Sequence, residues 1–317
     1  MRELKHIFLI NPAAGLQDST ERIRRDAAAE MKGFDYEILV TKGPGDATET
    51  VRRIAGEAGG EICRFYACGG DGTLSEVVNG AVGCENAEIA CLPYGTGNDF
   101  IKIFDKTELF RSICAQVHGE AMPMDVLAVN DRYSINICNA GLDARICHWV
   151  VRNKRKCLFG GGFPYKLSLA INFFRKIDRR YRIEIDGEPL EADITLMIAA
   201  NGRCYGGGFN AVPEADPEDG LLDILVIRKV SRPTFLRLLP DFAGGRHSEL
   251  GDCQFYRRAK SLTLVSERPE PISCDGDIIV TDRAEIRLVR NALRFVVPEG
   301  VRLVRNPCSP AGVPVGA

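Results

Sequence analysis

Short apolar runs alternate with amphipathic segments through the first part of the chain. Residues 7–10, 36–40, 62–68 and 89–92 are apolar, and the segments between them carry apolar side chains at helical spacing. Alternation of this kind predicts parallel strands joined by crossover helices. We therefore expect an α/β domain with a parallel sheet over residues 1–123.

Beyond this region the pattern changes to paired apolar runs joined by tight turns. The turn Asp186-Gly187 separates one such pair. Because Asp-Gly is the commonest signal of a two-residue hairpin, we expect a simple type I′ turn there. Residues 124–306 are therefore predicted to form a mainly antiparallel β domain, with helices near residues 144–152 and 165–177.

The junction of the two domains contains no Gly/Ser-rich or Pro-rich linker. The domains should therefore be joined rigidly, with a cleft between them. The last residues, 307–317, are mostly Pro, Gly and other small residues, and we expect this tail to be disordered.

The composition excludes several classes of protein. No apolar stretch among the 317 residues is long enough to span a bilayer, and the N-terminus lacks the apolar core of a signal peptide, so we expect a cytosolic protein. A net charge of −2 argues against general nucleic-acid binding. The 12 cysteines are scattered through apolar runs without a Cys-x-x-Cys pair, which favours reduced, buried thiols.

A glycine-rich loop follows the third apolar run and precedes a helical pattern. Its residues are Gly69, Gly70, Asp71, Gly72 and Thr73. Glycines let the backbone turn sharply and approach a ligand, and the helix N-terminus that follows suits phosphate. Asp71 would repel phosphate unless it binds a cation or takes up a proton, so it indicates chemistry as well as binding. Taken alone, the pentapeptide would also fit a strand-to-helix turn with a capping Asp.

Two further loops occupy the same position after a strand. Residues 11–15 read Asn-Pro-Ala-Ala-Gly, and residues 93–99 read Pro-Tyr-Gly-Thr-Gly-Asn-Asp. The carboxyl ends of the strands in an open parallel sheet gather along one edge, where ligands bind. The three loops together therefore predict a crevice for a nucleotide or a phosphate group.

In combination, these loops resemble the diacylglycerol kinase catalytic domain family, which includes bacterial lipid kinases and the sphingosine and ceramide kinases. The resemblance continues through residues 201–202, 206–209, 219–223 and 275–277 and so covers nearly the whole chain. It implies an ATP- and Mg²⁺-dependent lipid kinase. The fold that it implies is an NAD-kinase-like and diacylglycerol-kinase-like α/β domain followed by a mainly antiparallel β-sandwich that holds the lipid.

The resemblance also implies which residues hold the nucleotide. These are Asn11, Pro12, Gly15, Thr41, Gly69, Gly70, Asp71, Gly72, Thr73, Glu76, Thr96, Asn98 and Asp277. Thr41 matches a position where the family contacts nucleotide, although it would equally suit the entry to a helix.

Asp275 is the candidate general base for the lipid hydroxyl, and Asp71 is the second candidate catalytic residue. By the same resemblance, Asp275 stands in the family's catalytic Asp-Gly-Glu segment, with Asp277 in place of the Glu. That replacement keeps the charge but shortens its reach. A normal carboxylate is a weak base, so the role also requires a perturbed environment or a magnesium ion bridging to Asp71.

A structural magnesium site is implied at residues 216–223, where carboxylates gather before an apolar strand. Its ligands would be Asp216, Asp219 and the backbone carbonyl of Leu221, and oxygen-rich loops suit this ion. The alternative is an acidic turn that is merely solvated.

The region from Trp149 to Phe174 is rich in apolar and aromatic residues and could line an acyl-chain groove or form ordinary core. Cations flank it on both sides, and each one near an anionic membrane surface would add about 1 kcal/mol of attraction. We therefore expect a lipid substrate at a membrane surface and peripheral membrane contact, with a solvated basic face as the alternative. A homodimer is left open. The flanking cations are Arg152, Lys154, Arg155, Lys156, Arg175, Lys176, Arg179, Arg180 and Arg182.

Two other functions compete with the lipid kinase. NAD kinases have a related fold and share the Gly-Gly-Asp-Gly-Thr motif, but the loop at residues 93–99 and the apolar, basic-flanked region favour a lipid. A nucleotide-binding sensor without catalysis is kept open by Asp277 and by Ala14, which stands in a loop that often carries Ser. The presence of Asp71 and Asp275 argues against the sensor.

Overall fold

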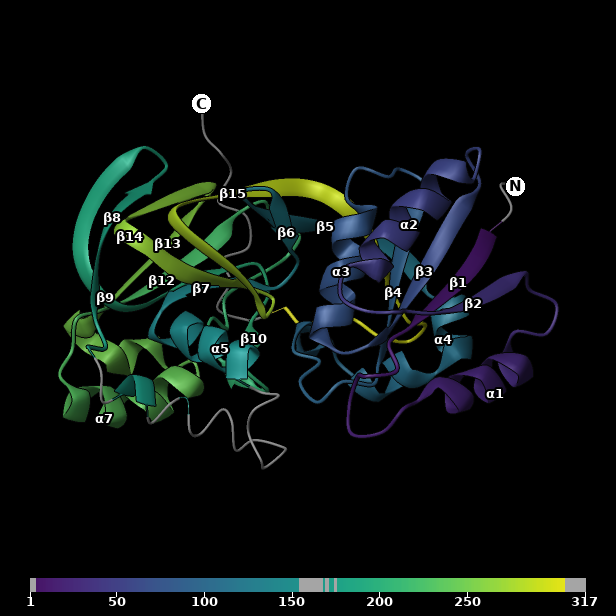
Figure 1. Cartoon of the computed structure of the whole chain (residues 1–317), viewed down its shortest axis with the longest axis horizontal. Helices are drawn as coiled ribbons and strands as arrows, with labels where there is room; N and C mark the ends of the chain where they lie inside the picture. Colours follow the sequence, from purple (N-terminus) through teal and green to yellow (C-terminus); the bar gives the residue numbers. More distant parts are fainter. Residues whose placement is uncertain (1–3, 154–167, 169–170, 174–175, 306–317) are drawn as a thin grey trace.

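The computed structural model describes residues 4–153, 168, 171–173 and 176–305, and it forms two domains that lie side by side (Figure 1). The predicted tail at residues 307–317 lies outside the described residues. In the first domain, strands and helices alternate: β1 (Leu4–Ile10), α1 (Thr20–Glu30), β2 (Tyr36–Val40), α2 (Asp46–Glu57), β3 (Ile62–Gly69), α3 (Asp71–Ala81) and β4 (Ala87–Pro93). Short helical segments follow: η1 (Phe100–Ile103), η2 (Thr107–Arg111) and α4 (Ile113–Val117).

The first-domain strands lie in the order β2-β1-β3-β4, and each neighbouring pair is parallel. Successive side chains of a strand point to opposite faces of the sheet. Phe65 therefore packs with Val51 of α2 and Val77 of α3, whereas the next residue, Tyr66, packs with Ile23 of α1 on the other face. Helices on both faces explain why these strands read as continuous apolar runs.

The second domain is built mainly from antiparallel strands. Its elements are β5 (Glu120–Val129), β6 (Arg132–Ser134), β7 (Ile137–Gly141), α5 (Leu142–Asn153), β8 (Arg179–Ile185), β9 (Glu188–Ala200), β10 (Cys204–Tyr205), β11 (Phe209–Asn210), β12 (Leu222–Arg228), α7 (Arg232–Ala243), η4 (His247–Cys253), β13 (Gln254–Ala259), β14 (Ser261–Cys274) and β15 (Asp277–Val297).

The predicted hairpin at Asp186-Gly187 is confirmed. These residues join β8 to β9 with φ angles of 48° and 84°, and a positive φ at both central residues defines a type I′ turn. The helix expected near residues 144–152 is also confirmed, as α5. Most of the helix expected near residues 165–177 falls outside the described residues.

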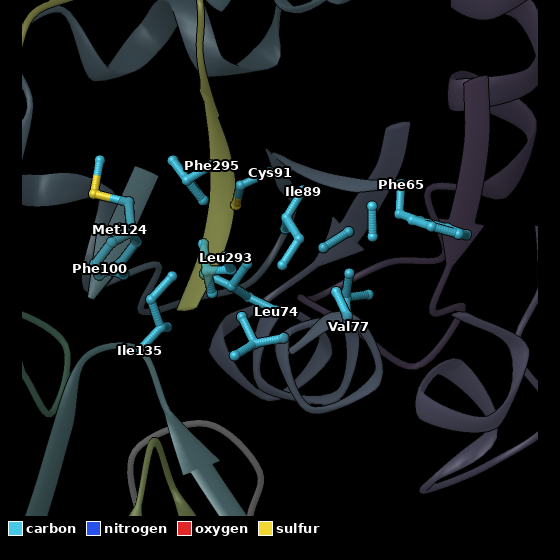
Figure 2. Close-up of a cluster of buried hydrophobic side chains, with 14 of the residues drawn as sticks. Phe65, Leu74, Val77, Ile89, Cys91, Phe100, Met124, Ile135, Leu293 and Phe295 are labelled. Carbon is cyan, nitrogen blue, oxygen red and sulfur yellow. The ribbon is translucent and has the colours of Figure 1, made fainter. Parts of the chain in front are cut away.

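The last strand joins the two domains. β15 pairs with β14 in the second domain, and its end pairs in parallel with β4 of the first. Phe295 of β15 is fully buried there against the rings of Phe100 and Phe104, and Leu293 lies near Leu74 of α3 (Figure 2). The sequence pattern does not predict that the last strand runs back into the sheet of the first domain. This pairing supports the expected rigid joint, because one strand belongs to both domains.

Two observations bear on the expected compartment. In the part of the chain that the structure describes, no helix is both long and apolar enough to cross a membrane. The ten cysteines among those residues are all free thiols.

Candidate active site

The three predicted loops meet at the carboxyl edge of the first-domain sheet. The carbonyl oxygen of Gly69 accepts hydrogen bonds from the amides of Tyr94 (2.8 Å) and Gly95 (3.0 Å). A Cβ atom on Gly95 would lie 2.3 Å from the Cα of Gly70, and one on Gly15 would lie 2.4 Å from the carbonyl oxygen of Tyr94. The loops therefore cross so closely that glycine is required at the contacts.

Polar side chains hold the first two loops together. The Asn11 amide donates to the hydroxyl oxygen of Thr73 at 3.0 Å. A Cβ atom on Gly69 would lie 2.2 Å from that same oxygen, so Thr73 fills the space that a side chain at position 69 would take. Helix α3 begins at Asp71, beside this crossing. The positive end of its dipole and its first amides face the place where the loops meet, which suits a phosphate group.

Two carboxylates lie under the crossing. The Asp71 carboxylate accepts a hydrogen bond from the amide of Asp99 at 2.6 Å. Burial raises the pKa of Asp71 above its ordinary value, and the charge of Asp99 raises it further. Asp99 is itself buried; one oxygen pairs with the Lys102 ammonium group, and the other accepts from the amide of Gly207 at 2.8 Å. Asp99 therefore joins the crossing loops to the second domain, a role that the sequence does not predict for it.

Asp275 lies in the two-residue turn between β14 and β15. Its carboxylate accepts four hydrogen bonds, from the Ser134 hydroxyl (2.7 Å) and from the amides of Ile135 (2.8 Å), Asn136 (3.2 Å) and Ile137 (3.0 Å). Burial raises the pKa of Asp275 to about 6. The perturbed environment that a general base requires is therefore present. A substrate hydroxyl would have to replace one of these donors. The Ser134 hydroxyl can make room for it by rotating away from Asp275.

The turn at Asp186 uses the same geometry at the surface. Asp186 and Asp275 both adopt a positive φ, of 48° and 50°. The Asp186 carboxylate accepts hydrogen bonds from the amides of Lys260 (3.0 Å) and Ser261 (2.8 Å), but it is exposed. The turn geometry therefore does not separate the two aspartates, whereas burial does.

The helix that follows the glycine-rich loop contacts the backbone next to Asp275. The Asn79 amide of α3 donates to the carbonyl oxygen of Tyr133 at 2.8 Å and accepts from its amide at 2.9 Å. Tyr133 precedes Ser134, which binds Asp275. Asn79 therefore links the element that carries Asp71 to the backbone that holds Asp275.

Asn79→Ala is expected to destabilise this joint. Removal of the side chain leaves a half-buried amide and carbonyl of Tyr133 unpaired, which costs about 1–3 kcal/mol per group when water cannot replace the lost partner. Urea unfolding would measure the loss. The Asn130 amide makes a similar pair of bonds to the exposed backbone at residues 283–285, so Asn130→Gly is the control, and an equal loss in that variant would contradict the special role of Asn79.

Two other predicted nucleotide ligands are engaged in local contacts. The Thr41 hydroxyl donates to the carbonyl oxygen of Ile10 at 3.3 Å, which ties the end of β2 to the end of β1. The Glu76 carboxylate accepts from the amide of Ala47 at 3.2 Å and so caps the start of α2. These contacts explain how both side chains hold the edge of the site, and their role in binding nucleotide stays a prediction.

Three more predicted ligands lie near the crossing or at the hairpin. Thr96 is exposed. The Asn98 side chain exchanges hydrogen bonds with the backbone of Gly95, at 3.2 Å from its amide and 2.8 Å to its carbonyl oxygen. Asp277 closes the hairpin at Asp275 and lies 3.7 Å from the Arg132 guanidinium, so its contact with nucleotide stays a prediction as well.

The acidic loop before β12 carries the predicted metal ligands, and their carboxylates are engaged in local contacts. Asp219 accepts from the amide of Leu221 at 2.9 Å and pairs with the Arg258 guanidinium, and Asp216 accepts from the amide of Glu218 at 3.1 Å. Within the described ranges, no group of three or more His, Cys, Asp or Glu residues is placed to hold a metal. A cation at Asp216, Asp219 and Leu221 would have to displace Arg258 from Asp219, and a metal site at this loop stays a prediction.

An apolar pocket of about 60 Å³ lies in the second domain and is lined by residues of both α5 and α7. Its lining is Leu142, Asp143, Ile146, Leu196, Tyr205, Phe209, Phe235, Leu239 and Phe242. The apolar region predicted from sequence reaches α5, but residues 154–167, 169–170 and 174–175 lie outside the described part of the chain. Phe209, Phe235 and Phe242, which lie far along the sequence, were not predicted to line a groove.

Comparison with known proteins agrees with this arrangement. Residues 5–129 match the family model of the diacylglycerol kinase catalytic domain, and residues 136–297 match that of the YegS C-terminal NAD kinase beta sandwich-like domain. A solved structure of a diacylglycerol kinase from Bacillus anthracis str. Sterne superposes with a TM-score of 0.69 at 22% identity, covering 95% of this chain and 98% of that one.

Curated relatives define the family more closely. The chain is 30% identical to the "Probable lipid kinase YegS-like" protein of Pseudomonas aeruginosa (strain UCBPP-PA14), over 92% of this chain and 95% of the relative. It is 26% identical to the "Diacylglycerol kinase" of Staphylococcus carnosus (strain TM300), over 85% and 87%. The fold and the two family models define this protein as a two-domain kinase. The chain belongs to the diacylglycerol kinase family of lipid kinases.

Proposed function

We propose that this chain transfers the γ-phosphoryl group of ATP to the hydroxyl of diacylglycerol or of a related membrane lipid. The observation that carries the proposal is a chain of hydrogen bonds across the domain joint. The backbone amide of Asn136 donates to Asp275, and the side chain of Asn136 donates to the carbonyl oxygen of Cys204 at 2.9 Å. Three residues further on, Gly207 binds Asp99, which binds Asp71. This chain of hydrogen bonds connects the candidate base, Asp275, to the loops that we propose to hold the phosphates.

The residues support a simple division of labour. The amides at the start of α3 and of the crossing loops would hold the phosphates, and the Lys102 ammonium group beside Asp99 would offset their charge. Asp275 would take the proton of the lipid hydroxyl, since with a pKa of about 6 it is mostly ionised at neutral pH.

The site also suits a magnesium ion bound with the nucleotide. Asp71 and Asp99 supply only oxygen donors, which this ion prefers. Burial and the neighbouring carboxylate both disfavour ionised Asp71, and a divalent cation would offset these costs. The ion would neutralise charge on the transferring phosphoryl group.

The second domain supports a lipid as the acceptor. Eight of the nine residues that line the pocket are apolar or aromatic, which suits an acyl chain and offers little to the charged dinucleotide NAD. The helices that line the pocket also carry exposed apolar side chains next to cations: Val151 (62% exposed) beside Arg152 on α5, and Leu236 (55% exposed) beside Arg237 on α7. These residues support peripheral contact with an anionic membrane surface.

Transfer of labelled γ-phosphate from ATP with magnesium tests the proposal, using diacylglycerol, a sphingoid base and NAD as acceptors. We expect label in one lipid. In Asp71→Asn the rate of transfer should fall by about 10²-fold or more, because a neutral amide cannot replace the charged carboxylate that binds the cation on the phosphates. Label in NAD would move the protein to the NAD kinases. Binding of ATP without transfer to any acceptor would favour the sensor.

A further inference from the structure

The pocket at α5 and α7 has one ionisable carboxyl group in its lining, that of Asp143. The space measures about 60 Å³, whereas a single water molecule needs roughly 10–15 Å³. A smaller, wholly apolar cavity shares Leu196, Phe235, Leu239 and Phe242 with it and lies under α7. The pocket lining is thus apolar or aromatic apart from one carboxyl group.

Asp143 lies in the first turn of α5 and is only 7% exposed. One of its oxygens accepts from the amide of Ala144 at 2.9 Å, and the other accepts from the hydroxyl of Tyr205 at 3.1 Å. Burial raises the pKa of Asp143 to about 7. The Arg145 guanidinium is turned to the carbonyl oxygens of Gly141, Lys176 and Ile177. A large share of Asp143 is therefore protonated at neutral pH, and its carboxyl group carries a hydrogen-bond donor.

Tyr205 connects this carboxyl group to the loop that carries Asp99. It lies on β10, which pairs with β11, and both Tyr205 and Phe209 of this ribbon line the pocket. The turn between the two strands contains Gly207, whose amide binds Asp99. The ribbon of β10 and β11 therefore contributes two aromatic rings to the pocket, and its glycine turn binds Asp99.

We propose that Asp143, oriented by Tyr205, binds the ester carbonyl of a glycerolipid whose acyl chain enters the apolar pocket. This rests on the proposed function and names its acceptor as an acyl ester of glycerol. An ester oxygen only accepts hydrogen bonds, so it pairs with the protonated carboxyl group. The ammonium group of a sphingoid base would need the ionised carboxylate, which burial disfavours.

Binding can be followed without any phosphoryl transfer. Trp149 is the single tryptophan of the chain and lies on α5, one turn after the pocket residue Ile146. Its fluorescence would be titrated with dioctanoylglycerol, with the matching dialkyl ether of glycerol, which lacks both carbonyl groups, and with sphingosine. The proteins would be the wild type, Asp143→Asn, which keeps a donor, and Asp143→Leu, which has none.

We expect the wild type to bind the diester about tenfold more tightly than the diether, the ratio that about one net hydrogen bond supplies. Asp143→Asn should keep the preference and Asp143→Leu should lose it. The wild-type preference should weaken above pH 7, where Asp143 ionises, and that of Asp143→Asn should not. A preference that survives in Asp143→Leu, no preference in the wild type, or tighter binding of sphingosine would overturn the proposal.

Label transfer in the same samples separates the two proposals. An ester preference in binding without phosphorylation of any lipid would leave this inference standing and reject the proposed function. Phosphorylation of diester and diether with equal kcat/KM, together with equal affinities, would reject this inference alone. Because Asp143→Asn is nearly isosteric, it tests the ester contact even if Asp143→Leu fails to fold.

Discussion

Asp275→Asn is expected to lower kcat for phosphoryl transfer by about 10²–10⁴-fold, the range that a positioned general base contributes. The carboxylate is half-buried, has a pKa of about 6 and is held by four hydrogen-bond donors. An amide cannot take the proton of the lipid hydroxyl. It would also direct its own donor at a backbone amide, so thermal unfolding of the variant must be measured beside its kinetics.

Asp186→Asn is the matched control. It lies in the same type I′ turn with nearly the same φ and also accepts hydrogen bonds from backbone amides, but at the surface of the molecule. Its kcat should equal that of the wild type. Equal losses of kcat in the two variants, in proportion to their losses of stability, would show that Asp275 acts only as a turn residue.

The pH dependence gives a second readout for the same carboxylate. Because only the ionised form accepts a proton, kcat/KM should fall as the pH drops through about 6, and residual activity of Asp275→Asn should lack this limb. Stability should change in the opposite sense. The folded chain holds this proton up to about pH 6, whereas the unfolded chain releases it near 3.8, so this group favours folding less as the pH rises from about 4 to 6.

The meeting of the three loops can be predicted from the sequence because its cause is local. Asn11, Gly70 and Tyr94 each follow directly after an apolar strand, and parallel strands bring their carboxyl ends to one edge. The structure adds the reason for the glycines, which is that the loops cross one another. That reason involves pairs of residues more than 20 positions apart, such as Gly70 and Gly95, and no local pattern contains it.

The residues that the sequence analysis did not find are those whose role depends on burial. Asp143 has the sequence context of an ordinary acid in a first helical turn, and only its 7% exposure and its contact with Tyr205 mark it as part of a pocket. Asp99 stands inside a recognised motif, but its contact with Gly207 depends on how two domains pack. The pairing of β15 with β4 is not predictable for the same reason, since Phe295 has the sequence context of any apolar strand residue.

Gly95→Ala is expected to abolish productive nucleotide binding, with a fall in kcat/KM for ATP of about 10²-fold or more, the loss that a displacement of about 1 Å can cause. The new methyl group would lie 2.3 Å from the Cα of Gly70. The position of a Cβ is fixed by its own backbone, and the atom that it meets is a backbone atom, so no side-chain rotation can relieve the overlap. The loops at residues 69–73 and 93–99 must therefore separate. The crossing that brings Asp99 to Asp71 would open with them.

Two further glycines turn this into a graded test. In Gly97→Ala the new methyl group would lie 2.6 Å from an oxygen of the Asp71 side chain, which can rotate at the cost of its bond to Asp99, so the loss should be smaller than in Gly95→Ala. Gly56 lies in α2 with nothing within 4 Å of a new Cβ, so Gly56→Ala should keep full activity and gain roughly 1 kcal/mol of stability from helix propensity. Calorimetric titration with ATP would rank the three variants. If Gly97→Ala binds ATP more weakly than Gly95→Ala, the position of the Asp71 carboxylate controls nucleotide binding, and the loop crossing does not.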